Sequence, residues 1–258
     1  FYIPRIKYTL SSTKDYYYVE SYFGPISNVE IKSVHKSKPV LAIAAKAFKN
    51  CSTLKTIKIP DGILVIDNNA FENCINLENI TCKISRTRFY NYRNAIYAHT
   101  NCKIKVKNSV FEKTQDRHIY VAINSILKVK TSTFLHSENE GVFINHNCVS
   151  KFMRCTFKDS GKELIKCLIW CQINIINCYF SEAKKAAILL QGTTLSSITA
   201  TTIEHSTGGI YLCDSSNEDV VHQDVLVEST IIRGIENKLS SKFESYGLLI
   251  SCGMSVKI

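Results

Sequence analysis

A step of 23 residues constrains this chain more than any other feature of its sequence. Apolar residues recur at that step in three rows, and the short segments that contain the first row repeat as well. The first row consists of Phe111, Phe134, Phe157, Phe180 and Ile203. The second row consists of Val106, Val129, Phe152, Ile175 and Ile198, and the third of Ile119, Val142, Ile165 and Ile188. A fixed period of this length is typical of stacked repeats, each of which contacts only its neighbours.

Within each repeat, apolar and polar residues alternate as they do in β-strands. Ile119, Val121 and Ile123 follow this alternation, as do Val142 and Ile144 one repeat later. A period of two predicts a strand with one buried face, whereas an amphipathic helix requires spacings of three and four. Short strands that recur coil after coil predict a parallel β-solenoid, and parallel crossovers are expected to wind in the right-handed sense.

A second motif with the same step occupies residues 39–82. The pattern Ala-Phe-x-Asn-Cys-x-x-Leu-x-x-Ile begins at Ala47 and again at Ala70. We expect a short turn of helix here, whose Phe and Leu side chains plug the coil before the next strand. This pattern resembles the BspA-like leucine-rich repeats of bacterial and protist surface proteins over about residues 16–82.

The later repeats have the style x-Ile-x-Asn-x-x-Phe, and residues 83–258 resemble the right-handed parallel β-helices of the pectate-lyase-like superfamily. We therefore expect a mainly β fold, a continuous solenoid with 23-residue coils. It has three parts: an N-terminal cap and degenerate repeat (1–38), BspA-like leucine-rich repeats (39–82) and a right-handed parallel β-helix (83–258). Ile96 lies 23 residues before Ile119, so the 23-residue period continues close to the junction between the leucine-rich repeats and the β-helix. We therefore expect one rod without a flexible linker.

The ends of the chain and its hydropathy bear on where the protein acts. The chain begins at Phe1 and ends in a strand-like segment, so we expect a piece of a longer or processed protein. No apolar run of 18 or more residues occurs, so no transmembrane helix is expected within these 258 residues. The BspA-like resemblance implies a cell-surface or secreted location.

Cysteine, histidine and acidic residues do not occur here at the spacings that metal sites and catalytic sites require. The chain has 11 cysteines but no Cys-x-x-Cys, and its 7 histidines lack metal-ligand spacing, so we expect neither a metal site nor another cofactor. Three cysteine pairs at the 23-residue step, Cys51 with Cys74, Cys148 with Cys171 and Cys155 with Cys178, are either buried small side chains or disulfides. The acidic residues are scattered, so we expect no carboxylates paired at the coil step along a strand and no catalytic residues.

Two rows of outward-facing side chains are the candidate binding residues. If Val106 and Ile119 point inward with the other members of their rows, strand alternation turns their neighbours outward. The first candidate row is Lys105, Lys128 and Lys151, with a shorter companion row of Lys107 and Lys130. The second candidate row is Tyr97, Tyr120 and Phe143, with Tyr211 in the equivalent position farther along.

Each row has two interpretations. The lysines are either a solvated surface or a stripe that binds a polyanion, and the net charge of +10 favours acidic partners in general. The rings either stack on sugars and anchor a protein partner, or are covered by a loop. The acidic segment 214–224 is a third candidate, as a solvated loop or a weak Ca²⁺ contact.

The expected function follows from the resemblances and the outward rows together. We expect a non-catalytic surface or adhesion-type repeat protein that binds host or matrix macromolecules or glycans, as the BspA-like resemblance implies. Its partner is then a protein or a glycan, for which the lysines suit a polyanion, rather than a nucleic acid. The alternative, which the β-helix resemblance allows, is a polysaccharide-active lyase or hydrolase, or a catalytically dead remnant of one. A purely structural rod is the third possibility.

Overall fold

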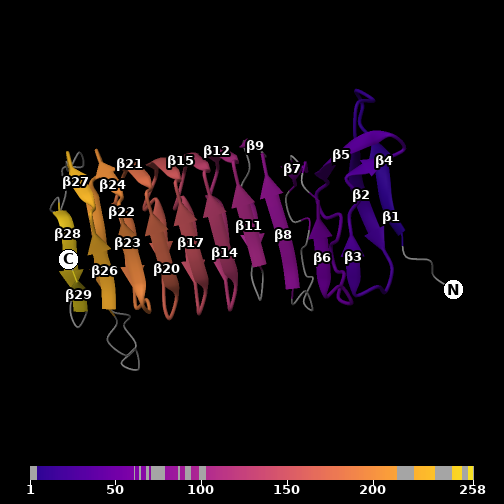
Figure 1. The fold of residues 1–258 in the computed structure, drawn as a ribbon. Coiled ribbons are helices and arrows are strands. Elements are labelled where there is room, and N and C mark those ends of the chain that lie inside the picture. Colours follow the sequence, from indigo (N-terminus) through magenta and orange to yellow (C-terminus); the bar gives the residue numbers. More distant parts are fainter. Residues whose placement is uncertain are drawn as a thin grey trace.

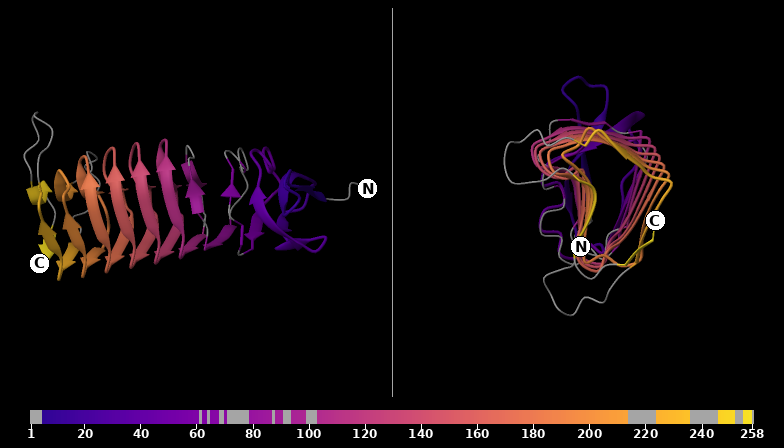
Figure 2. Two further views of the ribbon diagram at one scale, coloured as in Figure 1. Left: turned by 90° about the horizontal axis from the view of Figure 1, so that it is seen from above. Right: turned by 90° about the vertical axis from the view of Figure 1, so that its left-hand side faces the viewer.

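The computed structural model describes residues 5–60, 62–63, 65–67, 70, 79–86, 88–90, 94–98, 103–213, 224–235, 246–251 and 255–257. In these ranges the chain forms an elongated solenoid of stacked β-strands, from β1 at one end to β29 at the other (Figure 1). Seen along its axis, the successive coils superimpose in a closed outline (Figure 2). The expected mainly β solenoid is confirmed.

Three long parallel sheets line the sides of the solenoid. Sheet 1 has ten strands: β3 (Asn28–Glu30), β6 (Thr56–Ile59), β8 (Asn79–Ser85), β11 (Lys103–Lys107), β14 (Ile126–Lys130), β17 (Val149–Met153), β20 (Gln172–Ile176), β23 (Ser196–Thr199), β26 (Asp224–Glu228) and β29 (Ser255–Lys257). Sheet 2 has seven: β9 (Arg88–Tyr90), β12 (Val110–Thr114), β15 (Thr133–Ser137), β18 (Thr156–Ser160), β21 (Tyr179–Ala183), β24 (Thr202–Glu204) and β27 (Ile231–Arg233). Sheet 3 also has seven: β10 (Asn94–Ala98), β13 (Arg117–Ala122), β16 (Val142–Asn145), β19 (Ile165–Cys167), β22 (Ala186–Gln191), β25 (Gly208–Cys213) and β28 (Tyr246–Ser251).

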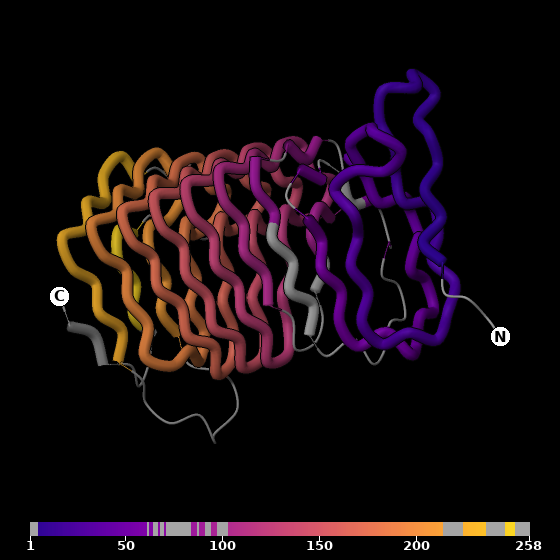
Figure 3. The backbone as a smooth tube through the Cα atoms, turned by 45° about the vertical axis from the view of Figure 1, so that its right-hand side comes forward, coloured from indigo at the N-terminus to yellow at the C-terminus, as the bar shows by residue number. Residues whose placement is uncertain are grey.

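The N-terminal end carries a smaller sheet. Its strands are β1 (Arg5–Leu10), β2 (Tyr17–Phe23), β4 (Val34–His35), β5 (Lys38–Ile43) and β7 (Val65–Ile66). Strands β1 and β4 run antiparallel to β2 and β5, whereas β2, β5 and β7 pair in parallel. This part is stacked on the same axis as the later coils (Figure 3). Sheet 1 continues across the join of the two repeat types, because β8 pairs with both β6 and β11.

A stack of phenylalanine rings fills the core. Phe134 and Phe157 lie in register on β15 and β18, with ring centroids 4.6 Å apart and planes 4° from parallel. Phe111 and Phe180 extend the stack on either side at 4.7 Å, and Phe89 continues it. All of these rings are buried. The 23-residue step therefore sets the inward phase that the sequence predicts.

The corner between sheets 1 and 2 turns on a single residue with positive φ, such as Asn108 or Asn177. The residue after this turn donates its backbone N–H to the side chain at the same position in the next coil, and these hydrogen bonds form a ladder. The Ser109 N–H donates to Ser132 Oγ at 3.2 Å, and the Cys155 N–H donates to Cys178 Sγ at 3.4 Å. Cys155 and Cys178 are free thiols at a position that takes serine in other coils. Both are buried small side chains rather than a disulfide, and so are Cys148 and Cys171. Cys74 of the third pair lies outside the described residues.

The leucine-rich segment differs from its predicted local structure. We expected a short turn of helix, but residues 44–53 form successive turns, with Cys51 N–H donating to Phe48 O and Leu54 N–H to Cys51 O. Each turn closes over three residues and none propagates, so the helix prediction is wrong here. Phe48 and Leu54 are fully buried, as expected. The second copy of the motif lies largely in residues 71–78, outside the described residues. Among those described, none forms a helix long and apolar enough to cross a membrane.

Candidate functional site

The predicted lysine rows lie in register on the outer face of sheet 1. Lys105 pairs with Lys128, which pairs with Lys151, and Lys107 pairs with Lys130. All are exposed except Lys151, which is half-buried. One further lysine that the sequence analysis missed, Lys103, is exposed on the same strand as Lys105. The backbone of Lys83 on β8 pairs with Lys105 at a step of 22 residues rather than 23.

These lysines are not neutralised by nearby acids. Within the described part of the chain, no carboxylate lies within ion-pair distance of a lysine on β11, β14 or β17. Strands in a sheet are about 4.8 Å apart, and two such charges repel by roughly 1 kcal/mol in water. The outer face of sheet 1 therefore holds a positive charge that an anionic partner would relieve.

Sheet 2 shows the opposite arrangement on its outer face. Its charged side chains pair with each other from coil to coil, and each pair joins adjacent strands. The pairs are Arg88–Glu112 at 2.6 Å, His136–Asp159 at 2.6 Å, Lys158–Glu182 at 3.1 Å and Arg233–Glu204 at 2.7 Å. These contacts hold the pKa values of Glu112 and Glu204 below their usual value, through side-chain hydrogen bonds from Arg88 to Glu112 and from Tyr179 and Arg233 to Glu204. These acids and bases of sheet 2 pair across coils, unlike the lysines on β11, β14 and β17 of sheet 1. Farther along sheet 1, Lys58 on β6 does pair with Glu30 on β3, at 2.6 Å.

The predicted aromatic row lies on the outer face of sheet 3. Tyr97, Tyr120 and Phe143 pair in register, and the half-buried rings of Tyr120 and Phe143 stack at 5.5 Å with planes 7° from parallel. Only the backbone of Tyr97 is described. The row continues through Lys166 and Leu189 before it reaches Tyr211, so the rings are not contiguous.

The lysine and aromatic rows occupy different sides of the solenoid. The lysines lie on sheet 1 and the rings on sheet 3, and the corner of residues 123–125 separates β13 from β14. The closed outline of the coils in Figure 2 shows that these sheets face in different directions. A ligand that contacts both rows must bend around this corner, so the rows are better treated as two surfaces.

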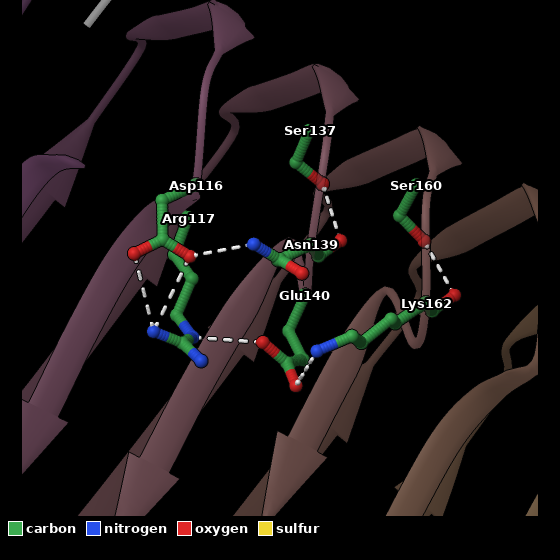
Figure 4. Close-up of polar contacts among 7 residues, drawn as sticks. All are labelled: Asp116, Arg117, Ser137, Asn139, Glu140, Ser160 and Lys162. Carbon is green, nitrogen blue, oxygen red and sulfur yellow. Dashed lines mark hydrogen bonds and ion pairs between the residues drawn. The ribbon is translucent and has the colours of Figure 1, made fainter. Parts of the chain in front are cut away.

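A charged network borders the rings where each coil enters sheet 3 (Figure 4). Arg117 Nε donates to Glu140 Oε2 at 2.8 Å, and its guanidinium lies 5.0 Å from the ring centre of Phe143. Lys162, which lies one coil after Glu140, places its Nζ 3.6 Å from Glu140 Oε1. Asp116 accepts a hydrogen bond from Asn139 at 3.0 Å.

Glu140 is the most enclosed member of this network, with only 2% of its surface exposed. Burial alone would raise the pKa of its carboxyl. Its own backbone N–H, Arg117 and Lys162 outweigh that effect, so the pKa lies below its usual value. Glu140 is therefore held as a carboxylate and is unsuited to donate a proton.

The expectation that no acids pair at the coil step is wrong. Asp159 and Glu182 lie on adjacent strands β18 and β21, and Glu140 and Glu163 stack just before β16 and β19. Each pair is 23 residues apart, so the sequence already contained the signal. Glu140 has a cationic partner in Arg117 and Glu182 has one in Lys158, while Asp159 Oδ2 lies 2.6 Å from His136 Nδ1. Glu163 is the exception: only 4% of its surface is exposed, and its Oε2 has no hydrogen-bond partner among the described residues.

Two further expectations concern metal binding. The acidic segment lies almost entirely in residues 214–223, outside the described residues. Among the side chains that the structure does describe, no group of three or more His, Cys, Asp or Glu could hold a metal ion.

Comparisons with known proteins bear on the family. A model described as a BspA type leucine-rich repeat region matches residues 26–141 in 6 copies. A model described as a right-handed β-helix region matches residues 117–258. The two matches overlap over residues 117–141, and the leucine-rich match extends past residue 82, where the sequence analysis ends that region. No curated protein matches the chain.

One similar solved structure is the leucine-rich repeat protein TpLRR of T. pallidum. It is 14% identical, and the match covers 56% of this chain and 83% of that one, with a TM-score of 0.29. That score is too low to bear on the fold. The β-helix match spans more than half of the chain and coincides with the three-sheet region of the structure. The chain therefore belongs to the right-handed β-helix family, with a BspA-type leucine-rich repeat region on its N-terminal side.

Proposed function

We propose that this protein is a non-catalytic binding protein, and that the lysines on β11, β14 and β17 hold a polyanionic macromolecule. The observation that carries the proposal is the register of Lys105, Lys128 and Lys151 on one flat face without acidic partners. An acidic glycan and an acidic protein surface both offer the required charge. The BspA-type region supports a cell-surface or secreted location for this role.

The lysines form a regular array. Successive strands are about 4.8 Å apart, and alternate residues on one strand are roughly 6.8 Å apart. A linear polyanion that lies along the solenoid axis meets Lys105, Lys128 and Lys151 in turn, while Lys107 and Lys130 flank it. Binding replaces repulsion between lysines with attraction to the ligand, so the ligand should also stabilise these coils.

The test compares chondroitin sulfate and polygalacturonate with neutral dextran. An exposed charge contact contributes about 0.2–1 kcal/mol, so the combined variant Lys105→Gln, Lys128→Gln and Lys151→Gln should bind the acidic glycans about tenfold more weakly at low salt. Its affinity should also depend less steeply on salt concentration. A matched variant, Lys32→Gln, Lys36→Gln and Lys184→Gln, removes the same charge from exposed sites away from this face. Equal affinities of the two variants would refute the proposal.

A polysaccharide-active enzyme is the second candidate, favoured by the stacked carboxylates Glu140 and Glu163. Retaining glycosidases place two carboxyl groups about 5–5.5 Å apart, near the spacing of adjacent coils. Such an enzyme needs both carboxyl groups open to the substrate, whereas Glu140 and Glu163 expose only 2% and 4% of their surface. We therefore favour binding without turnover.

The assay for turnover uses polygalacturonate, alginate and chondroitin, each with and without Ca²⁺. We expect no release of reducing or unsaturated ends. Reproducible release that Glu140→Gln or Glu163→Gln abolishes would establish the enzyme instead.

A further inference from the structure

The single tryptophan of the chain, Trp170, occupies a turn that does not suit its side chain. It lies at the corner between sheet 3 and sheet 1, with a φ of 57° and 46% of its surface exposed. One and two coils earlier, Asn147 and Asn124 turn the same corner, also with positive φ. Their amides are joined by a hydrogen bond of 2.9 Å from Asn147 Nδ2 to Asn124 Oδ1.

An asparagine at position 170 would suit the fold better than the tryptophan does. Asparagine tolerates the left-handed conformation, whereas a bulky residue is strained in it. Asparagine would also remove an exposed apolar ring from water. Residues that keep a strained conformation cluster at functional sites. The position of Trp170 therefore indicates that its ring makes a contact outside the chain.

Two exposed aliphatic side chains lie in the coils on either side of Trp170. Val149 begins β17 and Leu195 lies just before β23, with 42% and 67% of their surfaces exposed. Both strands pair with β20, which begins two residues after Trp170 (Figure 1). We call Val149, Trp170 and Leu195 the apolar corner.

The apolar corner borders the lysines on the outer face of sheet 1. Val149 and Lys151 are two residues apart on β17, so both side chains project from this face, roughly 6.8 Å apart. Ile126 and Lys128 repeat this arrangement one coil earlier, on β14. The face therefore has an apolar row beside a cationic row, and both rows run along the solenoid axis.

An anionic lipid bilayer is a partner that meets both rows. Lysines near an anionic membrane are attracted to its headgroups, and tryptophan is enriched at the boundary between headgroups and hydrocarbon. The exposure of Leu195 shows that it projects into solvent rather than lining a pocket. A bilayer admits projecting side chains without a cavity of matching shape, which a folded protein partner would have to provide. An acidic glycan would leave Val149 and Leu195 in water.

We propose that the outer face of sheet 1 docks on anionic lipid membranes. Lys105, Lys128 and Lys151 lie against the headgroups, and the apolar corner inserts at the edge of the hydrocarbon. This inference rests on the proposed function in one respect, because the same lysines meet the anion. It adds a second set of residues and a different partner.

The test measures sedimentation of the whole chain with phosphatidylcholine vesicles, with and without phosphatidylserine. We expect binding only when phosphatidylserine is present. The combined variant Lys105→Gln, Lys128→Gln and Lys151→Gln should bind about a hundredfold more weakly at low salt. Trp170→Asn should bind about tenfold more weakly. In the wild type, the fluorescence of Trp170 should shift to shorter wavelength on binding, because the indole leaves water.

Two controls separate the apolar corner from other exposed side chains and from misfolding. Ile231→Thr removes an apolar side chain that is 56% exposed on sheet 2, where Thr202 holds the equivalent position one coil earlier, and it should bind normally. Trp170→Asn should unfold at the same urea concentration as the wild type or a higher one, and a lower midpoint would contradict the strain argument.

The lipid and glycan measurements distinguish this inference from the proposed function. Absence of binding to the anionic vesicles, an unshifted fluorescence, or equal binding by Trp170→Asn and the wild type would overturn the inference. Lysine-dependent binding of acidic glycans would stand in each of those cases. Glycan binding that the combined lysine variant leaves unchanged would instead refute the proposed function.

Discussion

His118 should make the stability of the solenoid fall in mild acid. It lies inside the corner between sheets 2 and 3, with 1% of its surface exposed. Its Nδ1 is 2.7 Å from Thr114 Oγ1, and its ring lies 6.2 Å from Phe111 and 5.7 Å from Phe134. Burial lowers the pKa of this imidazole to about 3, and the charge of His136 adds to the effect. The folded protein therefore keeps His118 neutral at every pH above about 3.

The change in the free energy of unfolding with pH follows from the different proton binding of the folded and unfolded states. In the unfolded chain the pKa of a histidine is about 6.5, so below that pH the unfolded state binds a proton that the folded state does not. The contribution of neutral His118 is complete above pH 6.5 and is lost as the pH falls toward 3. Each pH unit in that interval costs at most about 1.4 kcal/mol, which gives a loss of about 2 kcal/mol at pH 5.

The measurement is the free energy of unfolding in urea at pH 8, 7, 6 and 5. The comparison variant is His118→Leu, because Leu164 occupies the equivalent position two coils later and is equally buried. Between pH 8 and pH 5 the wild type should lose about 2 kcal/mol more than the variant. The subtraction removes the contributions of the other histidines and of the carboxylates. Equal losses in the two proteins would refute the reasoning.

Three further predictions concern the core, the corner and the join. Phe157→Ala should cost about 3–5 kcal/mol in urea unfolding, and Phe157→Leu clearly less; a cost under ~1 kcal/mol for alanine would contradict the buried ring stack. Cys155→Ser should cost less than about 1.5 kcal/mol, because Ser132 fills the same ladder position; a loss of folding would show that the thiol has another role. Limited proteolysis should not separate a stable 1–82 piece from a stable 83–258 piece, because sheet 1 continues across that join; recovery of two stable pieces would show separate domains.

The sequence predicts which residues stack when they are 23 positions apart. It does not predict features that depend on how each coil bends in space. Stacking of Lys128 on Lys105 follows from a spacing of 23, and Lys83 is missed because the spacing there is 22. Periodicity states which residues stack but not the direction in which each sheet faces. The sequence therefore could not show that Tyr120 and Lys128 lie on different sides.

Glu163 shows a second limit of sequence reasoning. The spacing of 23 residues between Glu140 and Glu163 is visible in the sequence. The lack of a hydrogen-bond partner for Glu163 Oε2 among the described residues is not. Its environment depends on the small residues Ala186 and Gly208 in the following coils and on the ring of Tyr246, which comes from a distant part of the chain. Burial and missing partners of this kind arise only when the coils are assembled.

The corner ladder has a consequence for how such a chain can change its length. Each rung joins one coil to the next through a backbone N–H and the γ atom of a side chain, which is oxygen in Ser132 and Thr201 and sulfur in Cys178. Duplication or loss of a segment of 23 residues therefore leaves every remaining rung with a partner. Gain or loss of a single residue within a strand instead exchanges its inner and outer faces. Whole-coil duplication is thus the inexpensive route by which this rod can lengthen, and each added coil extends the outer faces by one more row.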